Sequence, residues 1–198
     1  MFVGAFVGAH IAFKYQQHAE KLKERGERVA AIKIAQGSIH SHWSSLKEIH
    51  EFLATHKSDL NKPFLNLKDI IRVRSIIPLN IQSLAFLYDG RFANLIQELT
   101  LVEGASNTAL EALKQRTQMI DQIHADMTDT RNIRIDEKRL TGSLDVVLGS
   151  RFVDLTESAE SSARDACAMA EKAFEALAAA GKELFPGEKF LKLEEERN

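Results

Sequence analysis

The sequence predicts an all-α fold, an elongated bundle of three long antiparallel helices that run up, down and up, with a small cap. Three long stretches carry apolar side chains at alternating three- and four-residue steps, the spacing of a helix face that packs on other helices. The chain has three prolines in 198 residues, so few positions interrupt these helices. The cap is expected to combine a loop, a short helix and the C-terminal tail.

The first long helix is expected to continue from the N-terminal segment to about His56. Its apolar seam consists of Val29, Ile32, Ile39, Trp43, Leu46 and Leu53, and Gln36 and His50 occupy two further positions of the same series. Repetition at these steps is the a and d pattern of a helix that packs along other long helices. We therefore expect this face to be the axis of the bundle.

A loop is expected at 57–79, because the helical period disappears there and Pro63 and Pro78 interrupt the chain. A short helix is expected at 80–88, before the Asp89-Gly90 turn signal, and the second long helix at 92–128. The packing face of this second helix contains Leu95, Leu99, Val102, Ser106, Leu110, Leu113, Thr117, Ile120, His124 and Met127.

The third long helix is expected from Asp136, a plausible N-cap, to about Leu184. Its packing face contains Leu144, Leu148, Phe152, Leu155, Ala159, Ala163, Ala166, Ala170, Phe174, Leu177 and Leu184. The alanine-lined half should let neighbouring helices approach closely. The sequence Phe185-Pro186-Gly187 ends the helix, residues 189–193 alternate like a short strand, and 194–198 are expected to fray.

Residues 1–16 form an apolar segment that is expected to be membrane-proximal or part of a transmembrane helix. The run from Phe2 to Phe13 is too short to span a bilayer, because about 12 helical residues cover about 18 Å of a core of about 30 Å. Membrane-helix packing is expected at the small residues Gly4, Gly8 and Ala12. Basic residues follow, which places the bundle in the cytoplasm at the inner membrane. The alternative is a cytoplasmic protein whose apolar helix end is buried in a homo-oligomer.

The bundle is expected to span 17–193, with a cap formed by 57–91 and 182–193 at the end far from the N-terminus. Six of the eleven phenylalanines lie in or next to these cap segments, and basic residues outnumber acidic ones there. The candidates for a partner-binding or anion-binding surface are Lys62, Lys68, Arg72, Arg74, Lys189 and Lys192. The alternative interpretation is a solvated basic rim around a structural plug.

Motifs for catalysis, metals and cofactors are not found in the sequence. The seven histidines include no i, i+4 pair, and the Glu-x-x-His signature of bundle di-metal sites does not occur. A glycine-rich phosphate loop and a G-x-S-x-G elbow are also missing. The one cysteine, Cys167, is expected to be an inert core thiol. We therefore expect no catalytic residue, no metal and no cofactor. A net charge of −2 and a pI of about 6.4 argue against nucleic acid as a partner.

Two short motifs support a resemblance. The first is Pro78-Leu79-Asn80-Ile81-Gln82-Ser83-Leu84-Ala85-Phe86-Leu87 with Asn94-Leu95, and the second is Glu183-Leu184-Phe185-Pro186-Gly187-Glu188-Lys189-Phe190-Leu191. With the apolar N-terminus, the chain resembles uncharacterised bacterial proteins that carry one N-terminal membrane helix and a long helical cytoplasmic domain. The resemblance implies this layout, and it transfers no catalytic residue because that group has no assigned activity.

These observations favour a non-enzymatic, membrane-proximal scaffold, adaptor or sensor that binds a protein or an anionic partner through its cap. One alternative is an enzyme with a cleft between cap and shaft that uses Arg72, Arg74 and a nearby carboxylate. Another is a self-associating membrane effector, supported by the spacing of Gly4 and Gly8.

Overall fold

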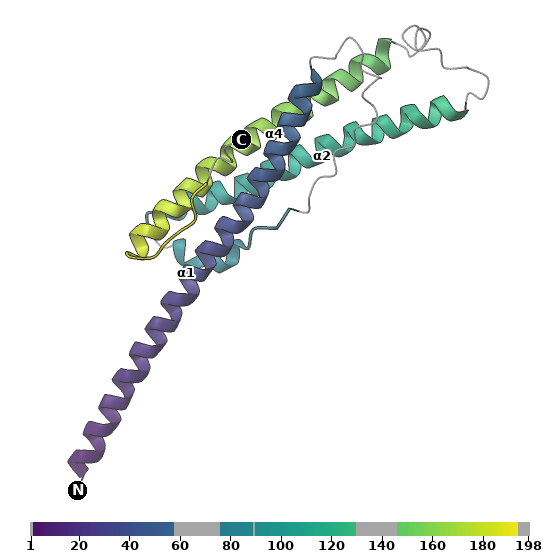
Figure 1. Ribbon diagram of the computed structural model, residues 1–198. Coiled ribbons are helices and arrows are strands. Elements are labelled where there is room, and N and C mark those ends of the chain that lie inside the picture. The colour runs from purple at the N-terminus through teal and green to yellow at the C-terminus, as the bar shows by residue number, and fades with distance from the viewer. Residues whose placement is uncertain (1, 58–75, 89, 130–145, 194–198) are drawn as a thin grey trace.

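The computed structural model describes residues 2–57, 76–88, 90–129 and 146–193, with side chains over 10–55, 76–88, 90–122 and 151–193. The described chain forms α1 (Phe2–Lys57), the 3-10 helix η1 (Ile81–Leu87), α2 (Ala93–Asp129) and α4 (Val146–Leu184) (Figure 1). These ranges contain no strand, which confirms the all-α prediction. The tail, residues 185–193, is irregular, so the short strand expected there is wrong.

The three long helices do not run up, down and up. Along α1, Trp43 lies opposite Cys167 and His50 lies opposite Glu160, so α4 is antiparallel to α1. Arg91, just before α2, pairs with Glu183, and Arg116 donates to Thr156, so α4 is also antiparallel to α2. It follows that α1 and α2 point the same way and α4 alone runs back, which corrects the expected order.

Chain length explains this outcome. The connection between α1 and η1 has about 20 residues and can reach about 65 Å when extended, whereas the helical span from 28 to 57 is about 45 Å long. Only residues 76–80 of this connection are described, and they lie along α1: Ser38 Oγ donates to the Pro78 carbonyl at 3.4 Å and Ile77 N donates to Ser41 Oγ at 3.4 Å. By Ile77 the chain is therefore back beside the middle of α1, before α2 begins.

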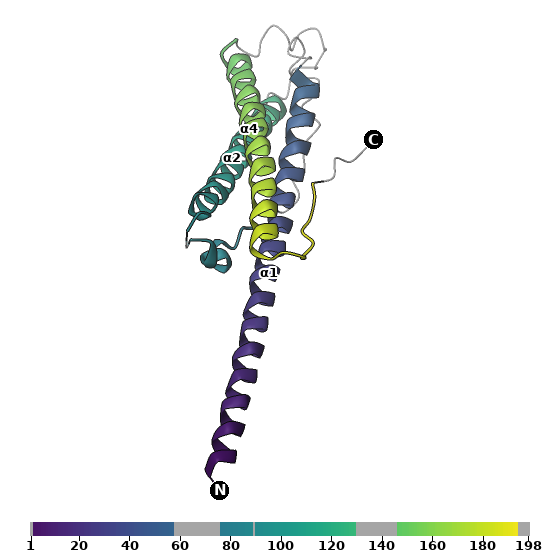
Figure 2. The ribbon, with the colours of Figure 1, turned by 90° about the vertical axis from the view of Figure 1, so that its left-hand side faces the viewer.

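Helix α4 is the central helix of the bundle. It packs on α1 along one side and on α2 along the other, and α1 and α2 make little direct contact (Figures 1 and 2). Four of the alanines predicted to line α4 are fully buried: Ala159, Ala163, Ala166 and Ala170. Their small side chains allow both neighbours to approach α4 closely.

The predicted packing faces are largely confirmed. Buried members of the seam on α1 are Val29, Ile32, Gln36, Ile39, Trp43, Leu46 and Leu53, and His50 is half-buried. The faces of α2 and α4 bury Leu95, Leu99, Val102, Ser106, Leu113, Ile120, Phe152, Phe174 and Leu177. Leu184 is instead 37% exposed, because α4 ends there and the chain turns away. The side chains of His124, Met127 and Leu148, and the whole of Asp136 and Leu144, fall outside the described set.

The described parts of the predicted cap, η1 and the tail, lie at the opposite end of the bundle from the one expected. The guanidinium carbon of Arg28 on α1 lies 5.4 Å from the ring centroid of Phe86 on η1. The ring centroid of Phe185 in the tail lies 6.4 Å from that of Phe86. η1 and the tail therefore meet α1 where it leaves the bundle, not at its Lys57 end (Figure 2). The error follows from the wrong helix order. Four of the six phenylalanines expected in the cap belong to one core cluster at this end, Phe86, Phe92, Phe185 and Phe190, whereas Phe52 packs near the other end of α1 and Phe64 lies outside the described residues.

Residues 2–28 of α1, the projecting half, extend beyond the bundle as a single helix (Figure 1). Every side chain described there, from His10 to Arg28, is exposed. Large apolar residues are among them: Ile11, Phe13, Tyr15 and Leu22 are 49–73% exposed. Within the described part of the chain, no helix combines the length and apolarity needed to cross a membrane. The transmembrane interpretation is thus not confirmed.

Several polar side chains are buried at the helix interfaces, and His42 is the most informative. It is 2% exposed, and its Nε2 lies 3.1 Å from the carbonyl of Ile77. Its Nδ1 has no hydrogen-bond partner among the described residues. Burial lowers the pKa of His42 below its ordinary 6.5, while the Ile77 carbonyl and the charge of Glu103 oppose that shift. The imidazole is therefore held neutral, with Nε2–H donating to Ile77.

We predict that the protein loses stability as the pH falls below about 6.5, in part because of His42. The unfolded chain takes up a proton on this imidazole before the folded chain does, so acid favours unfolding by up to about 1.4 kcal/mol per pH unit. The measurement is urea unfolding between pH 5 and 8. His42→Gln should flatten the curve, whereas His18→Gln, at an exposed position, should not. Equal slopes for both variants would refute this role of His42.

Candidate anion-binding groove

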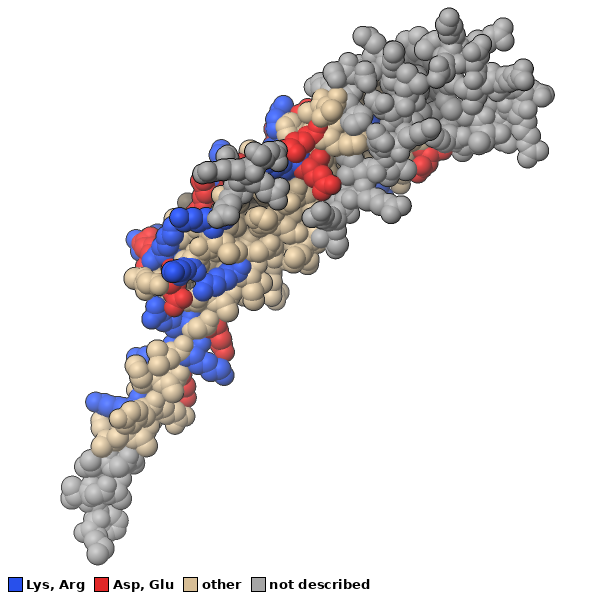
Figure 3. Space-filling model, viewed as in Figure 1, with Lys and Arg blue, Asp and Glu red and all other residues tan. Residues whose placement is uncertain are grey.

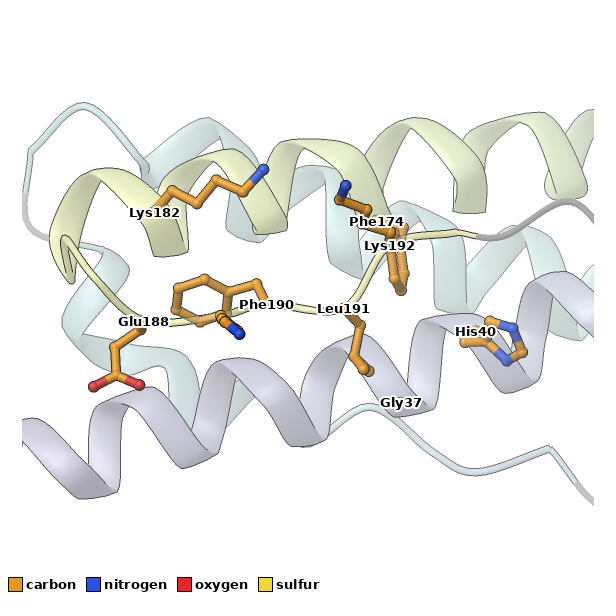
Figure 4. Close-up of a pocket in the computed structure, with 9 residues that line it drawn as sticks. Gly37, His40, Phe174, Lys182, Glu188, Phe190, Leu191 and Lys192 are labelled. Carbon is orange, nitrogen blue, oxygen red and sulfur yellow. The ribbon is translucent and has the colours of Figure 1, made fainter.

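A groove of about 950 Å³ lies between α1, the C-terminal end of α4 and the tail (Figure 4). Helix α1 contributes Gly37 and His40, and α4 contributes Phe174 and Lys182. The tail contributes a continuous wall from Glu188 to Lys192. Figure 4 shows Phe190 and Leu191 on the tail between the two helices, with His40 on α1 and Lys182 on α4. The groove exists because the tail folds back between these helices.

The tail is turned back by a short local structure. Phe185 N donates to the Gly181 carbonyl at 2.9 Å, and Glu188 N donates to the Phe185 carbonyl at 3.1 Å. Gly187 has a φ of +90°, a backbone conformation that glycine adopts without the steric cost of a side chain. Lys33 and Arg25 of α1 then approach the Glu188 carboxylate, at 3.7 Å and 3.9 Å. The helix stop predicted from the sequence is thus also the hinge that directs the tail along α1.

Gln36 holds the middle of the tail. Its Nε2 donates to the Leu191 carbonyl at 3.2 Å, and Leu191 N donates back to Oε1 at 3.1 Å. The Gln36 side chain is fully buried, at a seam position where an apolar residue would be usual. The amide therefore supplies the buried tail backbone with the partners that it would otherwise lack.

Phe190 anchors the same segment by packing on α4. The ring is 9% exposed and sits over Gly181, where an added Cβ would come within 2.8 Å of ring atoms. The Lys33 ammonium lies 5.9 Å from the ring centroid on the side of α1. Phe190 is thus held between two helices, and only a glycine at 181 leaves room for it.

Positive charge dominates the lining of the groove. Lys182, Lys189 and Lys192 are exposed, and none forms an ion pair with any residue that the structure describes. The lining contains one carboxylate, Glu188, and Arg25 and Lys33 already neutralise it from outside. Figure 3 shows Lys and Arg side chains gathered around the tail and the beginning of the projecting half. The groove can therefore attract an anion.

The sequence-based candidates are only partly brought together. Lys189 and Lys192 line the groove, whereas Lys62, Lys68, Arg72 and Arg74 lie outside the described residues. Lys182 lies within the predicted basic cap segment 182–193 but was not named as a candidate. Sequence reasoning missed His40 and Phe174, because their place in the groove depends on the fold-back of the tail. Ala12 lies on the exposed projecting half. Gly4 and Gly8 belong to α1, but the surroundings of these two residues are outside the described set.

Other chemistry has little support from the described geometry. Over the described ranges, no group of three His, Cys, Asp or Glu side chains converges in a way that could hold a metal ion. Burial raises the pKa of the Cys167 thiol, which keeps it protonated and a poor nucleophile. The groove is therefore the feature from which function is argued.

Comparison with protein-family models, curated proteins and solved structures finds no match for this chain. The resemblance to bacterial membrane-anchored helical proteins thus stays a prediction, supported only in that the fold is helical.

We predict that Gln36→Leu destabilises the protein by about 1–2 kcal/mol, because the backbone N–H and C=O of Leu191 lose their partner. Urea unfolding gives the free energy, and limited proteolysis reports release of the tail. Gln97→Leu, at an exposed position of α2, is the matched control and should change little. If the two variants are equally stable and equally resistant to protease, the amide pairing contributes nothing.

A second prediction compares two helical glycines. Gly104→Ala should raise the melting temperature, because nothing lies within 4 Å of an added Cβ and alanine favours a helix by about 1 kcal/mol. Gly181→Ala has the same helix preference but must displace the Phe190 ring. It should therefore give no gain or a loss, with faster cleavage of the tail. A gain equal to that of Gly104→Ala would show that Phe190 is not held as described.

Proposed function

We propose that this protein is a non-enzymatic helical scaffold or adaptor, which rests on a membrane surface through its projecting half and offers the groove to an anionic partner. The observation that carries this proposal is the continuity of α1. One half of this helix is buried in the bundle, and the other half stands outside it with apolar and basic side chains exposed.

The projecting half needs a partner on physical grounds. Helices in proteins gain most of their stability from packing an apolar face, and the exposed apolar side chains of this half do not pack on the described bundle. Its sequence begins with the apolar run from Phe2 to Phe13 and continues the heptad of the bundle, so Ile11, Tyr15 and Leu22 fall in register with Val29. Apolar area exposed in this way is typical of helices that lie in a membrane interface.

Charge favours an anionic surface over a second copy of the chain. In this register, Lys14, Lys21 and Arg28 flank the seam on one side. The positions facing them in a parallel pair would be Ala19, Gly26 and Lys33, which offer no carboxylate. Basic residues at such places are attracted by anionic headgroups. By the same charge bias, we place the bundle in the cytoplasm, against the inner membrane.

The position of the groove refines the sequence-based proposal. Partner binding was expected at a cap held away from the membrane, but η1 and the tail meet α1 where it leaves the bundle. We therefore propose that partner binding takes place on the membrane-proximal side. An enzymatic cleft that uses Arg72 and Arg74 has no comparable support, since both residues lie outside the described ranges.

Vesicle co-sedimentation of the full chain tests the membrane part. We expect binding to vesicles that contain phosphatidylglycerol and much weaker binding to phosphatidylcholine vesicles. Lys14→Glu with Lys21→Glu should weaken the first interaction at least about tenfold, at about 1 kcal/mol per basic residue. Lys172→Glu, at an exposed position of α4, is the matched control.

Two outcomes would overturn this part of the proposal. One is equal binding of the double variant and the control to anionic vesicles. The other is a pair of results: the wild-type chain does not bind vesicles, and it forms a concentration-dependent dimer that Ile11→Ser abolishes. This outcome would assign the projecting half to self-association.

A further inference from the structure

We propose that the groove binds a small amphiphilic anion, in which a phosphate group is attached to an apolar body. The phosphate would lie among Lys182, Lys189 and Lys192, and the apolar body against Leu191 and the accessible edge of Phe190, over the buried Phe174. This inference rests on the groove part of the proposed function and names its ligand class. It does not depend on the membrane part.

The cationic side of the groove is built from two separate elements. Lys182 comes from α4, whereas Lys189 and Lys192 come from the tail. All three lysines line one groove, and each lacks an ion pair with the described residues. An anion with several oxygens could accept hydrogen bonds from more than one of these ammonium groups. A phosphate monoester has that arrangement of acceptors.

The apolar side of the groove argues against a purely inorganic ion. Leu191 is 51% exposed although its backbone is fixed by Gln36, so a half-exposed leucine is held at this place. Phe174 and Phe190 line the same groove from α4 and from the tail. The volume of about 950 Å³ is that of small-molecule sites, which combine apolar walls with a few polar groups. An apolar body on the ligand would cover this surface.

Ligand binding should also reinforce the fold-back of the tail. The wall from Glu188 to Lys192 belongs to the tail, and the facing residues belong to α1 and α4. A molecule that contacts both sides binds only when the tail is docked. By mass action it then stabilises the docked tail.

The experiment is isothermal titration of the full chain with three probes: phenyl phosphate, inorganic phosphate and phenol. We expect phenyl phosphate to bind at least tenfold more tightly than inorganic phosphate, and phenol not to bind. The combined Lys182→Gln, Lys189→Gln and Lys192→Gln variant should lose at least tenfold in affinity for both phosphates. These lysines are exposed, so the variant should fold, and circular dichroism checks this. Lys172→Gln, outside the groove, should bind as the wild type does.

Leu191→Ser distinguishes binding of the apolar body from binding of the phosphate group. It should remove most of the advantage of phenyl phosphate over inorganic phosphate and leave inorganic phosphate binding unchanged. Dihexanoyl phosphatidic acid below its micelle concentration distinguishes the source of the phosphate. Binding tighter than that of phenyl phosphate assigns the site to a lipid headgroup, and weaker binding assigns it to a soluble phosphate ester.

The contrary results distinguish the proposal of an amphiphilic ligand from the proposal that the groove binds an anion. Equal affinity for phenyl phosphate and inorganic phosphate would overturn the amphiphilic ligand and leave the groove as an anion site. Failure of every phosphate probe, or unchanged binding by the triple lysine variant, would overturn the anionic role of the groove altogether.

Discussion

The close packing of α4 between two parallel helices determines the shape of this protein. Four fully buried alanines, Ala159, Ala163, Ala166 and Ala170, form the surface on which α1 and α2 approach. Larger side chains at these positions would push at least one neighbour away, since a packed interface accommodates added volume poorly. Because α1 and α2 touch each other little, this contact with α4 is what joins them.

Polar residues buried on α1, one on the seam and two beside it, bond the irregular segments. Gln36 bonds the backbone of the tail, and Ser38 and His42 bond the carbonyls of Pro78 and Ile77. Segments without helical hydrogen bonds leave backbone groups that need partners when they are buried. Gln36 on the seam, and Ser38 and His42 beside it, provide these partners. Buried polar residues on α1 therefore mark where the tail and the segment before η1 pack on this helix.

Helix α1 joins two different environments without a break. From Val29 onward its seam is buried by α4, η1 and the tail, whereas the same register before Val29 is exposed. The groove lies at the boundary between these halves, because the tail packs on α1 at Gln36. In our proposal, the exposed half and the groove both face anionic partners. Their location at one end of the bundle would bring a membrane surface and an anionic ligand close together.

Much of the fold could be predicted from the sequence, because the hydrophobic period of a helix is a local property. The ends of α1 and α2, most of the buried faces and the stop at Phe185-Pro186-Gly187 follow from it. The direction of α2 cannot be predicted from this local period, because a connection of about 20 residues can reach either end of the part of α1 that lies in the bundle. The direction of α2 places η1 and the tail, with Phe86, Phe92, Phe185 and Phe190, at the end of the bundle opposite to the one expected.

The candidate site was less predictable than the fold. Lys189 and Lys192 could be identified from charge, and Lys182 lies in the same predicted basic segment, but the groove also needs His40 and Phe174, which no local pattern connects to them. Their meeting depends on the space at Gly181, on the ring of Phe190 and on the amide of Gln36. The sequence by itself thus determined which residues form helices and which faces are buried, since these depend on neighbours along the chain. Only the tertiary structure decided the helix order and the position of the groove, because both depend on contacts between residues far apart in sequence.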